Sequence, residues 1–347
     1  MDAQQRERYS RQILFSEIGE AGQERLCAAS AVLVGCGALG TVVANLLVRA
    51  GLGKLRVVDR DFVEPSNLQR QTLFEEADAR ESMPKAIAAQ RRLTAVNADV
   101  RVEGIVADVT PGNIDDLLGG FPLVLDGTDN FETRLLVNDF AVSRSVPWIY
   151  AAAVGSYGLS MPVYPGQTAC LACLVESTGI SDPAAVPAAE ATCDTVGVLG
   201  AAAGVIASIE AASAIKLLLG KSSAADSRLV SCDVWTGRFQ SVRPIRDPGC
   251  RACGRGAFSY LHGEEQPHLM LCGRDSVQIH ERRRRLDLAA LGRRMSASGT
   301  DVRHNDFLLR CRIPPYEMTV FGDGRAIIKG TRDPAVARSL YARYIGS

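Results

Sequence analysis

Four cysteines in two C-x-x-C pairs are the residues whose spacing most directly predicts chemistry. Cys170 and Cys173 form the first pair, and Cys250 and Cys253 form the second. If the fold brings the pairs together, four thiolates make a closed, tetrahedral site of the structural zinc type. Disulfide bonds are the alternative. The ten cysteines of the chain, without a recognisable secretion signal, suggest a reducing compartment and therefore favour zinc.

A glycine-rich loop follows the first apolar stretch of the chain. In VLVGCGALG, residues 32–40, Gly35, Gly37 and Gly40 form the pattern G-x-G-x-x-G, and the next apolar stretch ends in Asp59. Such a loop places phosphates at a helix N-terminus, and the acid binds ribose hydroxyls. The pattern predicts an adenine-nucleotide site but does not by itself distinguish ATP from NAD.

Polar side chains directly after the ribose acid favour a triphosphate. The segment DRDFVEPSNLQRQ contains Asp61, Asn67, Gln69, Arg70 and Gln71. A dehydrogenase needs a cation here only to accept a 2′-phosphate, which the ribose acid would repel. An arginine beside amide side chains suits a β- or γ-phosphate, through charge-assisted hydrogen bonds. The alternative interpretation is a polar surface loop.

Lys85 is a second indication of a triphosphate. The segment ESMPKAIAAQ predicts that Lys85 lies in the first turn of a helix. The helix dipole disfavours a cation there by about 0.3–1 kcal/mol. A lysine in that position could hold a triphosphate together with the helix amides. A solvated surface lysine is the alternative.

A third group of polar residues follows the apolar stretch LVLD, which ends in Asp126. Asp129 and Asn130 come just after it, on the rim where open α/β sheets bind ligands. A carboxylate beside a triphosphate is what Mg²⁺ requires. Alternatively, Asp126 caps a turn and Asp129 caps a helix that begins at Phe131.

Cys193 is the remaining candidate for covalent chemistry. It lies in ATCDTVGVLG, after a segment rich in Ala, Pro, Ser and Thr (176–192) that we expect to be a mobile crossover loop. A helix N-terminus lowers a thiol pKa and so favours a thiolate nucleophile. An unreactive small residue is the alternative. Because the first histidine is His262, histidine-dependent nucleophilic catalysis is excluded from the preceding residues unless the C-terminal region reaches across.

Alternating strands and helices must position these residues. Apolar strands are predicted at 31–35, 54–59, 100–109, 122–126 and 147–153, with helices between them. This alternation predicts an α/β fold with a doubly wound, Rossmann-like, mostly parallel sheet. Two hairpins and a long apolar helix (197–219) follow. The apolar run in that helix is too short to span a bilayer, so we expect a buried helix.

A domain boundary is predicted near Gly254, dividing a main domain, 1–254, from a small α+β domain, 255–347. The second domain is expected to contain strands at 269–279 and 306–313, a hairpin turning at FGDGRAI and two helices. The 39 basic and 39 acidic residues balance, which gives no indication of a nucleic acid or membrane partner. Cysteine usage and the charged start of the chain predict a cytoplasmic protein.

Taken together and in order, these motifs resemble the ThiF/MoeB/HesA family of bacterial relatives of ubiquitin-activating enzymes. They are RYSRQILF, GCGALG, VVDRDFVEPSNLQRQ, PKA, DGTDN, the two cysteine pairs and TCDTVGVLG, within residues 6–254. The family uses ATP to adenylate the C-terminal glycine of a small ubiquitin-like sulfur carrier and releases pyrophosphate. The resemblance therefore implies that the glycine loop holds ATP, with Mg²⁺.

The resemblance also implies roles for individual residues. ATP contacts are expected from the glycine loop, Asp59, Ser66, Asn67, Leu68, Gln69, Arg70 and Lys85, with Asp129 and Asn130 at the metal–phosphate end. Ala38 stands where many relatives have a second glycine. Arg11 resembles an arginine that the family inserts into the neighbouring subunit's site, which implies a homodimer. Cys193 matches a cysteine linked to sulfur or acyl transfer, with a cysteine desulfurase or another protein as sulfur donor.

Within the family, the segments GSYGLS, TCDTVGVLG, DVWTGRF and LCGRDSVQI look most like ThiF-type enzymes of thiamine thiazole synthesis. A MoeB-like enzyme acting on the carrier of molybdopterin synthase is the first alternative. An NAD(P)-dependent oxidoreductase and a non-catalytic protein that binds a ubiquitin-like partner are the alternatives from other classes. The segment around Cys272 lacks the active loop of a rhodanese, so we do not expect one.

Overall fold

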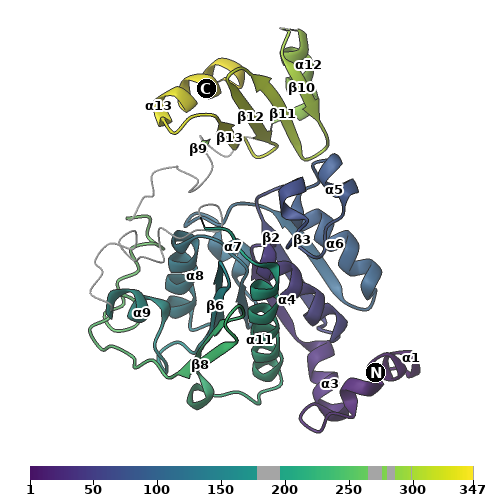
Figure 1. The fold of residues 1–347 in the computed structure, drawn as a ribbon, viewed down its shortest axis with the longest axis vertical. Helices are drawn as coiled ribbons and strands as arrows, with labels where there is room; N and C mark the ends of the chain where they lie inside the picture. The colour runs from purple at the N-terminus through teal and green to yellow at the C-terminus, as the bar shows by residue number, and fades with distance from the viewer. Residues whose placement is uncertain (178–195, 265–275, 280–285, 298, 347) are drawn as a thin grey trace. The chain divides into compact units, whose positions relative to one another are not determined.

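The computed structural model describes residues 1–177, 196–264, 276–279, 286–297 and 299–346. The chain forms two compact units, Met1–Glu265 and Gln266–Ser347 (Figure 1). The sequence analysis placed the boundary after residue 254. The predicted crossover loop, 176–192, and Cys193 lie almost entirely outside the described residues.

The first unit is built on an eight-stranded sheet with the order β3-β2-β1-β4-β5-β6-β7-β8. Its strands are β1 (Ser30–Val34), β2 (Lys54–Asp59), β3 (Arg101–Val106), β4 (Val124–Asp126), β5 (Trp148–Val154), β6 (Tyr157–Val163), β7 (Leu229–Asp233) and β8 (Arg238–Val242). The pairings from β3 through β5 are parallel, and those from β5 through β8 are antiparallel. The doubly wound, mostly parallel sheet and both predicted hairpins are confirmed.

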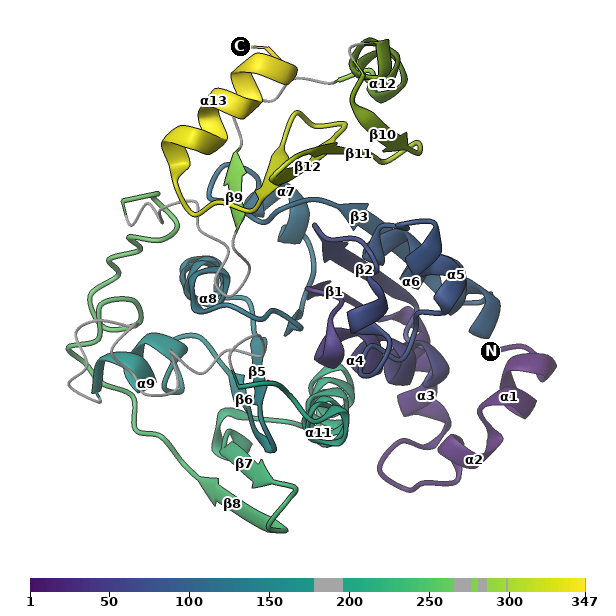
Figure 2. The ribbon, with the colours of Figure 1, turned by 45° about the horizontal axis from the view of Figure 1, so that its top comes forward.

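Helices cover both faces of this sheet. The α-helices described in the first unit are α1 (Ala3–Arg8), α2 (Ser10–Ile13), α3 (Gly19–Ala28), α4 (Ala38–Arg49), α5 (Glu76–Arg80), α6 (Lys85–Val96), α7 (Ile114–Leu118), α8 (Phe131–Arg144), α9 (Leu171–Ser177) and α11 (Gly200–Leu218). Helices α4, α6 and α11 lie on one face, and α7 and α8 lie on the other (Figure 2). The central strand β1 is buried along nearly its whole length, as a parallel strand between two helical layers must be.

By length and composition, α11 is the one helix among the described residues that could cross a membrane. Ile206, Ala207, Ala211 and Ala214 are nevertheless buried on it, where α11 packs on β5, β6 and α4. The helix therefore occupies the place of a core helix in the first unit, as the sequence predicted.

The second unit is a five-stranded antiparallel sheet with the order β10-β11-β12-β13-β9. Its elements are β9 (Ser276–Ile279), α12 (Leu288–Ala297), β10 (Asp301–His304), β11 (Leu308–Ile313), β12 (Tyr316–Phe321), β13 (Ala326–Lys329) and α13 (Pro334–Tyr344). Cys311, Met318, Ile328 and Val277 align across four strands and pack against residues of both helices. The α+β class is confirmed, although β10 was not predicted.

The loops after β1 and β4 meet at one edge of the first unit's sheet. Gly35, with a φ of +88°, and Gly127 approach so closely that a Cβ on either residue would overlap the other's backbone. Gly40 lies in the first turns of α4, and a Cβ on it would lie only 2.1 Å from the carbonyl oxygen of Gly35. Helix α4 begins at Ala38 with Gly37 as its N-cap, so alanine occupies an ordinary helical position there.

We expect Gly127→Ala to lower the free energy of unfolding by about 1–3 kcal/mol, because added atoms would displace packed backbone. Gly204→Ala in α11 is the matched control. Its Cβ would meet no atom within 4 Å, so the helix should gain about 0.5–1 kcal/mol. Urea denaturation of the two variants measures both values. Equal stability of the two variants would contradict the close packing at this edge.

Candidate functional site

Asp59 connects the glycine loop to the segment that follows β2. Its buried carboxylate accepts hydrogen bonds from the backbone N–H groups of Cys36 (2.6 Å) and Asp61 (2.7 Å). Burial raises the pKa of Asp59, and the nearby Lys85 offsets part of that shift. The carboxylate thus holds two loops together at the edge of the sheet where the sequence predicts a ribose.

Lys85 is the first residue of α6, and its side chain is only 6% exposed. The alternative of a solvated surface lysine is therefore wrong. Its Nζ lies 3.1 Å from Oδ2 of Asp61. Burial alone would lower the pKa of Lys85, but attraction to Asp61, Asp59 and Asp129 outweighs burial and raises the pKa. Lys85 is a protonated cation at the carboxyl edge of the sheet.

The segment 64–71 is more ordered than a polar surface loop. Asn67 ends the short 3-10 helix η1 (Pro65–Asn67), is buried, and accepts a hydrogen bond from the backbone N–H of Glu64. Gln71 is also buried, and its Oε1 has no hydrogen-bond partner among the described residues. The Gln71 side chain lies near Gly37 of the glycine loop. Asn67 and Gln71 therefore both belong to the buried side of this segment.

Arg70 is partly exposed, and it donates a hydrogen bond to the carbonyl oxygen of Ser66 (2.9 Å). The first residue of α11 packs on this loop. A Cβ on Gly200 would lie 3.3 Å from the carbonyl oxygen of Gln69 and 3.5 Å from Cβ of Arg70. Ser66 and Gln69 are exposed, and Leu68 is partly buried. The beginning of α11 therefore lies against the residues that the sequence predicts to bind phosphate.

Asp129 lies on the turn between β4 and α8, with its side chain exposed. Asn130 is the N-cap of α8, and its Oδ1 accepts a hydrogen bond from the backbone N–H of Thr133 (2.8 Å). The proposed capping role of Asp129 is therefore wrong. The alternative for Asp126 is right, since its carboxylate caps the turn by accepting from the N–H and Oγ1 of Thr128.

The charges at this edge fit a nucleotide that arrives with a divalent cation. The electrostatic neighbours of Lys85 and Arg60 are the carboxylates of Asp59, Asp61, Asp108 and Asp129. Four carboxylates thus surround these two cations. Carboxylate oxygens are the ligands that Mg²⁺ prefers. Asp129, on its turn, is the exposed member of these four carboxylates.

Arg11 is not brought to this edge in its own chain. It is exposed on α2 beside Gln12, whose side chain donates a hydrogen bond to the carbonyl oxygen of Ala50 (2.9 Å). Ala50 follows the C-terminal end of α4, whereas the nucleotide residues surround the beginning of that helix. A role for Arg11 therefore requires the site of another subunit.

The two cysteine pairs come together as predicted. The Sγ atoms of Cys170 and Cys250 lie 3.7 Å apart, and those of Cys173 and Cys253 lie 3.4 Å apart. All four Sγ atoms lie within 4.8 Å of one another, and the cysteines are free thiols. A tetrahedral ion with Zn–S bonds of about 2.3 Å would separate its sulfur ligands by about 3.8 Å. The group can hold a zinc ion.

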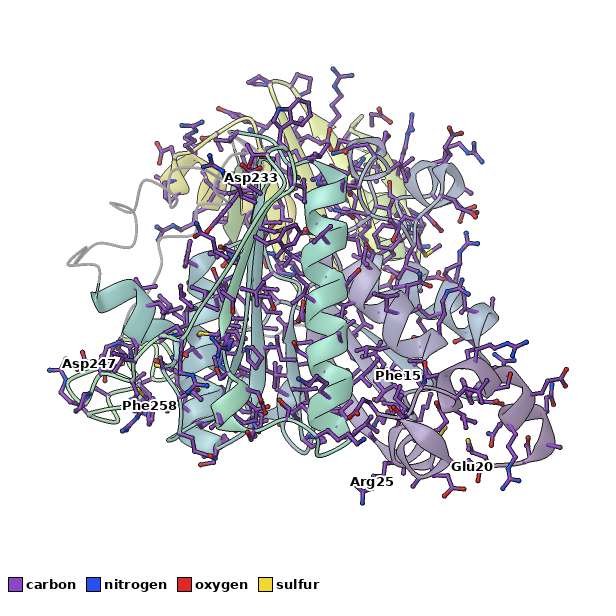
Figure 3. The ribbon with its side chains drawn as sticks, turned by 60° about the horizontal axis from the view of Figure 1, so that its bottom comes forward. Phe15, Glu20, Arg25, Asp233, Asp247 and Phe258 are labelled. Atoms are coloured by element: carbon purple, nitrogen blue, oxygen red, sulfur yellow. The ribbon has the colours of Figure 1, made fainter. Side chains whose placement is uncertain are left out.

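Helix α8 supports both cysteine loops through adjacent residues. Asn138 accepts a hydrogen bond from the backbone N–H of Leu171 in the first pair (2.9 Å). The buried carboxylate of Asp139 accepts two hydrogen bonds from Arg251 in the second pair (2.9 and 3.0 Å). In Figure 3, Asp247 and Phe258, which flank the second pair, lie beside α9. The group therefore clips distant segments of the chain to α8.

Sequence reasoning assigned no role to Arg134, Asp139, Glu210 or Arg251. All four are ionisable residues that make buried contacts with other segments of the chain. Arg134, Asp139 and Glu210 had one sequence signal, an ionisable residue on an otherwise apolar helix, whereas Arg251 lies in a turn and had none.

Comparisons with known proteins give consistent results. Residues 9–252 match the model of the ThiF family. A Bacillus subtilis (strain 168) protein named sulfur carrier protein ThiS adenylyltransferase is 45% identical over 98% of this chain and 99% of its own length. The Escherichia coli (strain K12) molybdopterin-synthase adenylyltransferase is 34% identical over 72% of this chain and 96% of its own length.

A crystal structure of E. coli MccB with ATP resembles the fold. Its TM-score is 0.61 at 24% identity, over 71% of this chain and 74% of that chain. At this identity the likeness supports the fold of the sheet and its helices, and no more.

Elemental analysis of the purified protein should find about one zinc ion per chain, as the four-thiolate geometry requires. Cys250→Ser should lose the zinc and unfold at a lower temperature. Cys27→Ser is the matched control, because Cys27 lies outside the group, and it should keep the full zinc content. A Cys250→Ser variant that retains its zinc would show that Cys250 is not a ligand.

Proposed function

The chain belongs to the ThiF family, and from that premise we propose that it adenylates a small ThiS-like sulfur carrier protein with ATP. The carrier's C-terminal glycine carboxylate is the acceptor, and pyrophosphate is the second product. The near full-length relative named for this reaction supports the assignment. The observation of the structure that carries it is the buried, protonated Lys85 among carboxylates beside the glycine loop.

The proposed step is a displacement at the α-phosphorus of ATP. A carboxylate oxygen of the carrier forms a bond to that phosphorus, and the bond from the phosphorus to the oxygen bridging the α- and β-phosphates breaks. The electron pair of the broken bond leaves with pyrophosphate. Because the attacking carboxylate is already ionised at neutral pH, no general base is needed. The absence of histidine before His262 is consistent with this chemistry.

The chain's own residues then act by positioning and charge neutralisation. Asp59 holds the ribose, while Lys85 and Arg70 bind the phosphates, and Gln71 offers a buried acceptor. Asp129 and Asn130 hold the metal–phosphate end. When bound, Mg²⁺ would neutralise the negative charge of the phosphates. We assign Arg11 to the site of a second copy, so the active form is a homodimer.

This arrangement favours adenylation over the two alternatives from other classes. A dinucleotide oxidoreductase has no use for a carboxylate-rich rim beside a buried lysine. A protein that only binds a carrier needs no buried cation at the end of a glycine loop. Both would leave Lys85 and Asp129 without a role.

The carrier we propose is ThiS-like, for sulfur transfer in thiamine thiazole synthesis. The Bacillus subtilis relative named for ThiS is 45% identical and aligns along both units, whereas the molybdopterin-synthase relative is 34% identical over 72% of this chain. A cysteine desulfurase or another sulfur donor would act after adenylation, in the cytoplasm. Cys193, which lies outside the described residues, is the proposed thiol of that later step.

Nucleotide choice gives the first test. ATP with Mg²⁺ should raise the unfolding temperature, since a ligand at a hundred times its Kd stabilises by about 2.7 kcal/mol. NADH at the same concentration should leave the temperature unchanged. Differential scanning fluorimetry with each nucleotide measures both shifts. Stabilisation by NADH without any by ATP would refute adenylation.

A division of labour between Asp129 and Cys193 gives the second test. Asp129→Ala removes a carboxylate from the metal–phosphate end, and a metal–oxyanion contact is worth several kcal/mol. The pyrophosphate burst with the carrier should therefore fall by about a hundredfold or more. Cys193→Ala should keep the burst and lose carrier thiocarboxylate. Pyrophosphate is measured by quenched flow and thiocarboxylate by mass spectrometry.

Two outcomes would contradict these roles. A normal burst in Asp129→Ala would remove Asp129 from the metal–phosphate end. Normal thiocarboxylate formation by Cys193→Ala would show that Cys193 is an unreactive residue and that sulfur is delivered directly to the adenylate.

A further inference from the structure

We propose that Arg134 is a positioning residue that fixes Asp129 at the metal–phosphate end of the site. The proposal rests on the adenylation function above, because it concerns how the turn bearing Asp129 is held. Arg134 lies one helical turn after the N-cap of α8, and its side chain is only 7% exposed.

The guanidinium of Arg134 links three segments of the chain. Its Nε donates a hydrogen bond to Oδ2 of Asp126 at 3.1 Å. One terminal nitrogen donates to the carbonyl oxygens of Thr128 (2.7 Å) and Ala151 (3.1 Å). The end of β4, the turn and strand β5 are therefore fixed to one rigid, planar group on α8.

The residue that benefits from these contacts is Asp129. Arg134 holds the carbonyl oxygen of Thr128, and Asp126 holds the N–H and Oγ1 of the same threonine at 2.9 and 2.7 Å. The Thr128 carbonyl belongs to the planar peptide that leads into Asp129. Asn130 is fixed on the other side as the N-cap. Asp129 therefore has an exposed carboxylate on a backbone anchored at both ends.

Glu210 of α11 completes the support from the opposite face of the sheet. It is fully buried, and its Oε1 accepts a hydrogen bond from the backbone N–H of Asp126 (3.0 Å). Burial raises the pKa of Glu210 well above its usual value and so favours the neutral carboxyl group. A neutral Glu210 leaves the ion pair of Asp126 and Arg134 balanced.

Stability alone is a poor reason for this arrangement. A buried ion pair costs desolvation energy that its attraction often fails to repay, and apolar residues of similar volume are frequently as stable. What the pair does supply is a fixed orientation of the groups that it joins. The planar guanidinium donates hydrogen bonds to the carboxylate and the carbonyl oxygen in fixed directions. That geometry is directed at the turn that carries Asp129.

The test is a double-mutant cycle between Arg134→Lys and Asp129→Ala. Lysine keeps the charge, but a single ammonium cannot span Asp126, Thr128 and Ala151. In the native background, Arg134→Lys should lower kcat for pyrophosphate release by about tenfold or more, since misplacement by 1 Å can cost a hundredfold. KM for ATP should change by less than about twofold. In the Asp129→Ala background the same substitution should change kcat by less than about twofold.

Arg144→Lys is the matched control on the same helix. Arg144 also makes a two-point pair, with Asp115 at 2.9 and 3.0 Å, but both residues are exposed. This variant should keep kcat unchanged. Thr128→Val removes only the Oγ1 hydrogen bond and should give a smaller kcat defect that also vanishes in the Asp129→Ala background. It provides the same cycle if Arg134→Lys does not fold.

Equal kcat losses in both backgrounds would overturn the proposal, because the effect would then bypass Asp129. A rise in KM for ATP that matches a fall in unfolding temperature would also overturn it, as a merely structural role predicts. Failure of the proposed function looks different. The native protein would then release no pyrophosphate with a ThiS-like carrier, before any variant is compared.

Discussion

The close approach of Gly35 and Gly127 is the constraint on which the site depends. The two residues end neighbouring parallel strands, and their backbones are too close for a side chain on either one. The glycine loop and the turn bearing Asp129 therefore leave the sheet together. Asp59 adds the third strand through its hydrogen bond to the N–H of Cys36. Three loops that are far apart in sequence therefore form one surface. The close approach of two of them is possible because Gly35 and Gly127 have no Cβ.

The parts of the fold that follow local rules could be predicted from the sequence. The alternation of apolar strands and helices is explicit, and the glycine loop has its own signature. The cysteine group could be predicted because thiolate spacing is a strong pattern. Lys85 could be singled out because a cation in the first turn of a helix is disfavoured by the helix dipole. Its buried ion pair with Asp61 explains why a lysine is nevertheless found there.

Other features were beyond prediction because they depend on contacts that no local pattern encodes. Strand β10, with one apolar residue in Asp301–His304, forms by pairing with β11 at the edge of its sheet. Asp139 and Arg251 meet across more than a hundred residues of chain, and each alone reads as a surface charge. The capping of α8 by Asn130 instead of Asp129 is a choice between two good caps that only backbone geometry decides.

Helix α8 connects the turn that carries Asp129 with the two cysteine loops. Asp129 precedes the helix, and Asn138 and Asp139 near its middle grip the two cysteine loops. The helix rises about 1.5 Å per residue, so roughly 15 Å separate the grip from the turn. It is a lever arm: a tilt of about 4° about the grip would carry the turn through about 1 Å, a displacement large enough to matter for catalysis. The length of α8 thus converts a small tilt at the cysteine group into a displacement at the turn that carries Asp129.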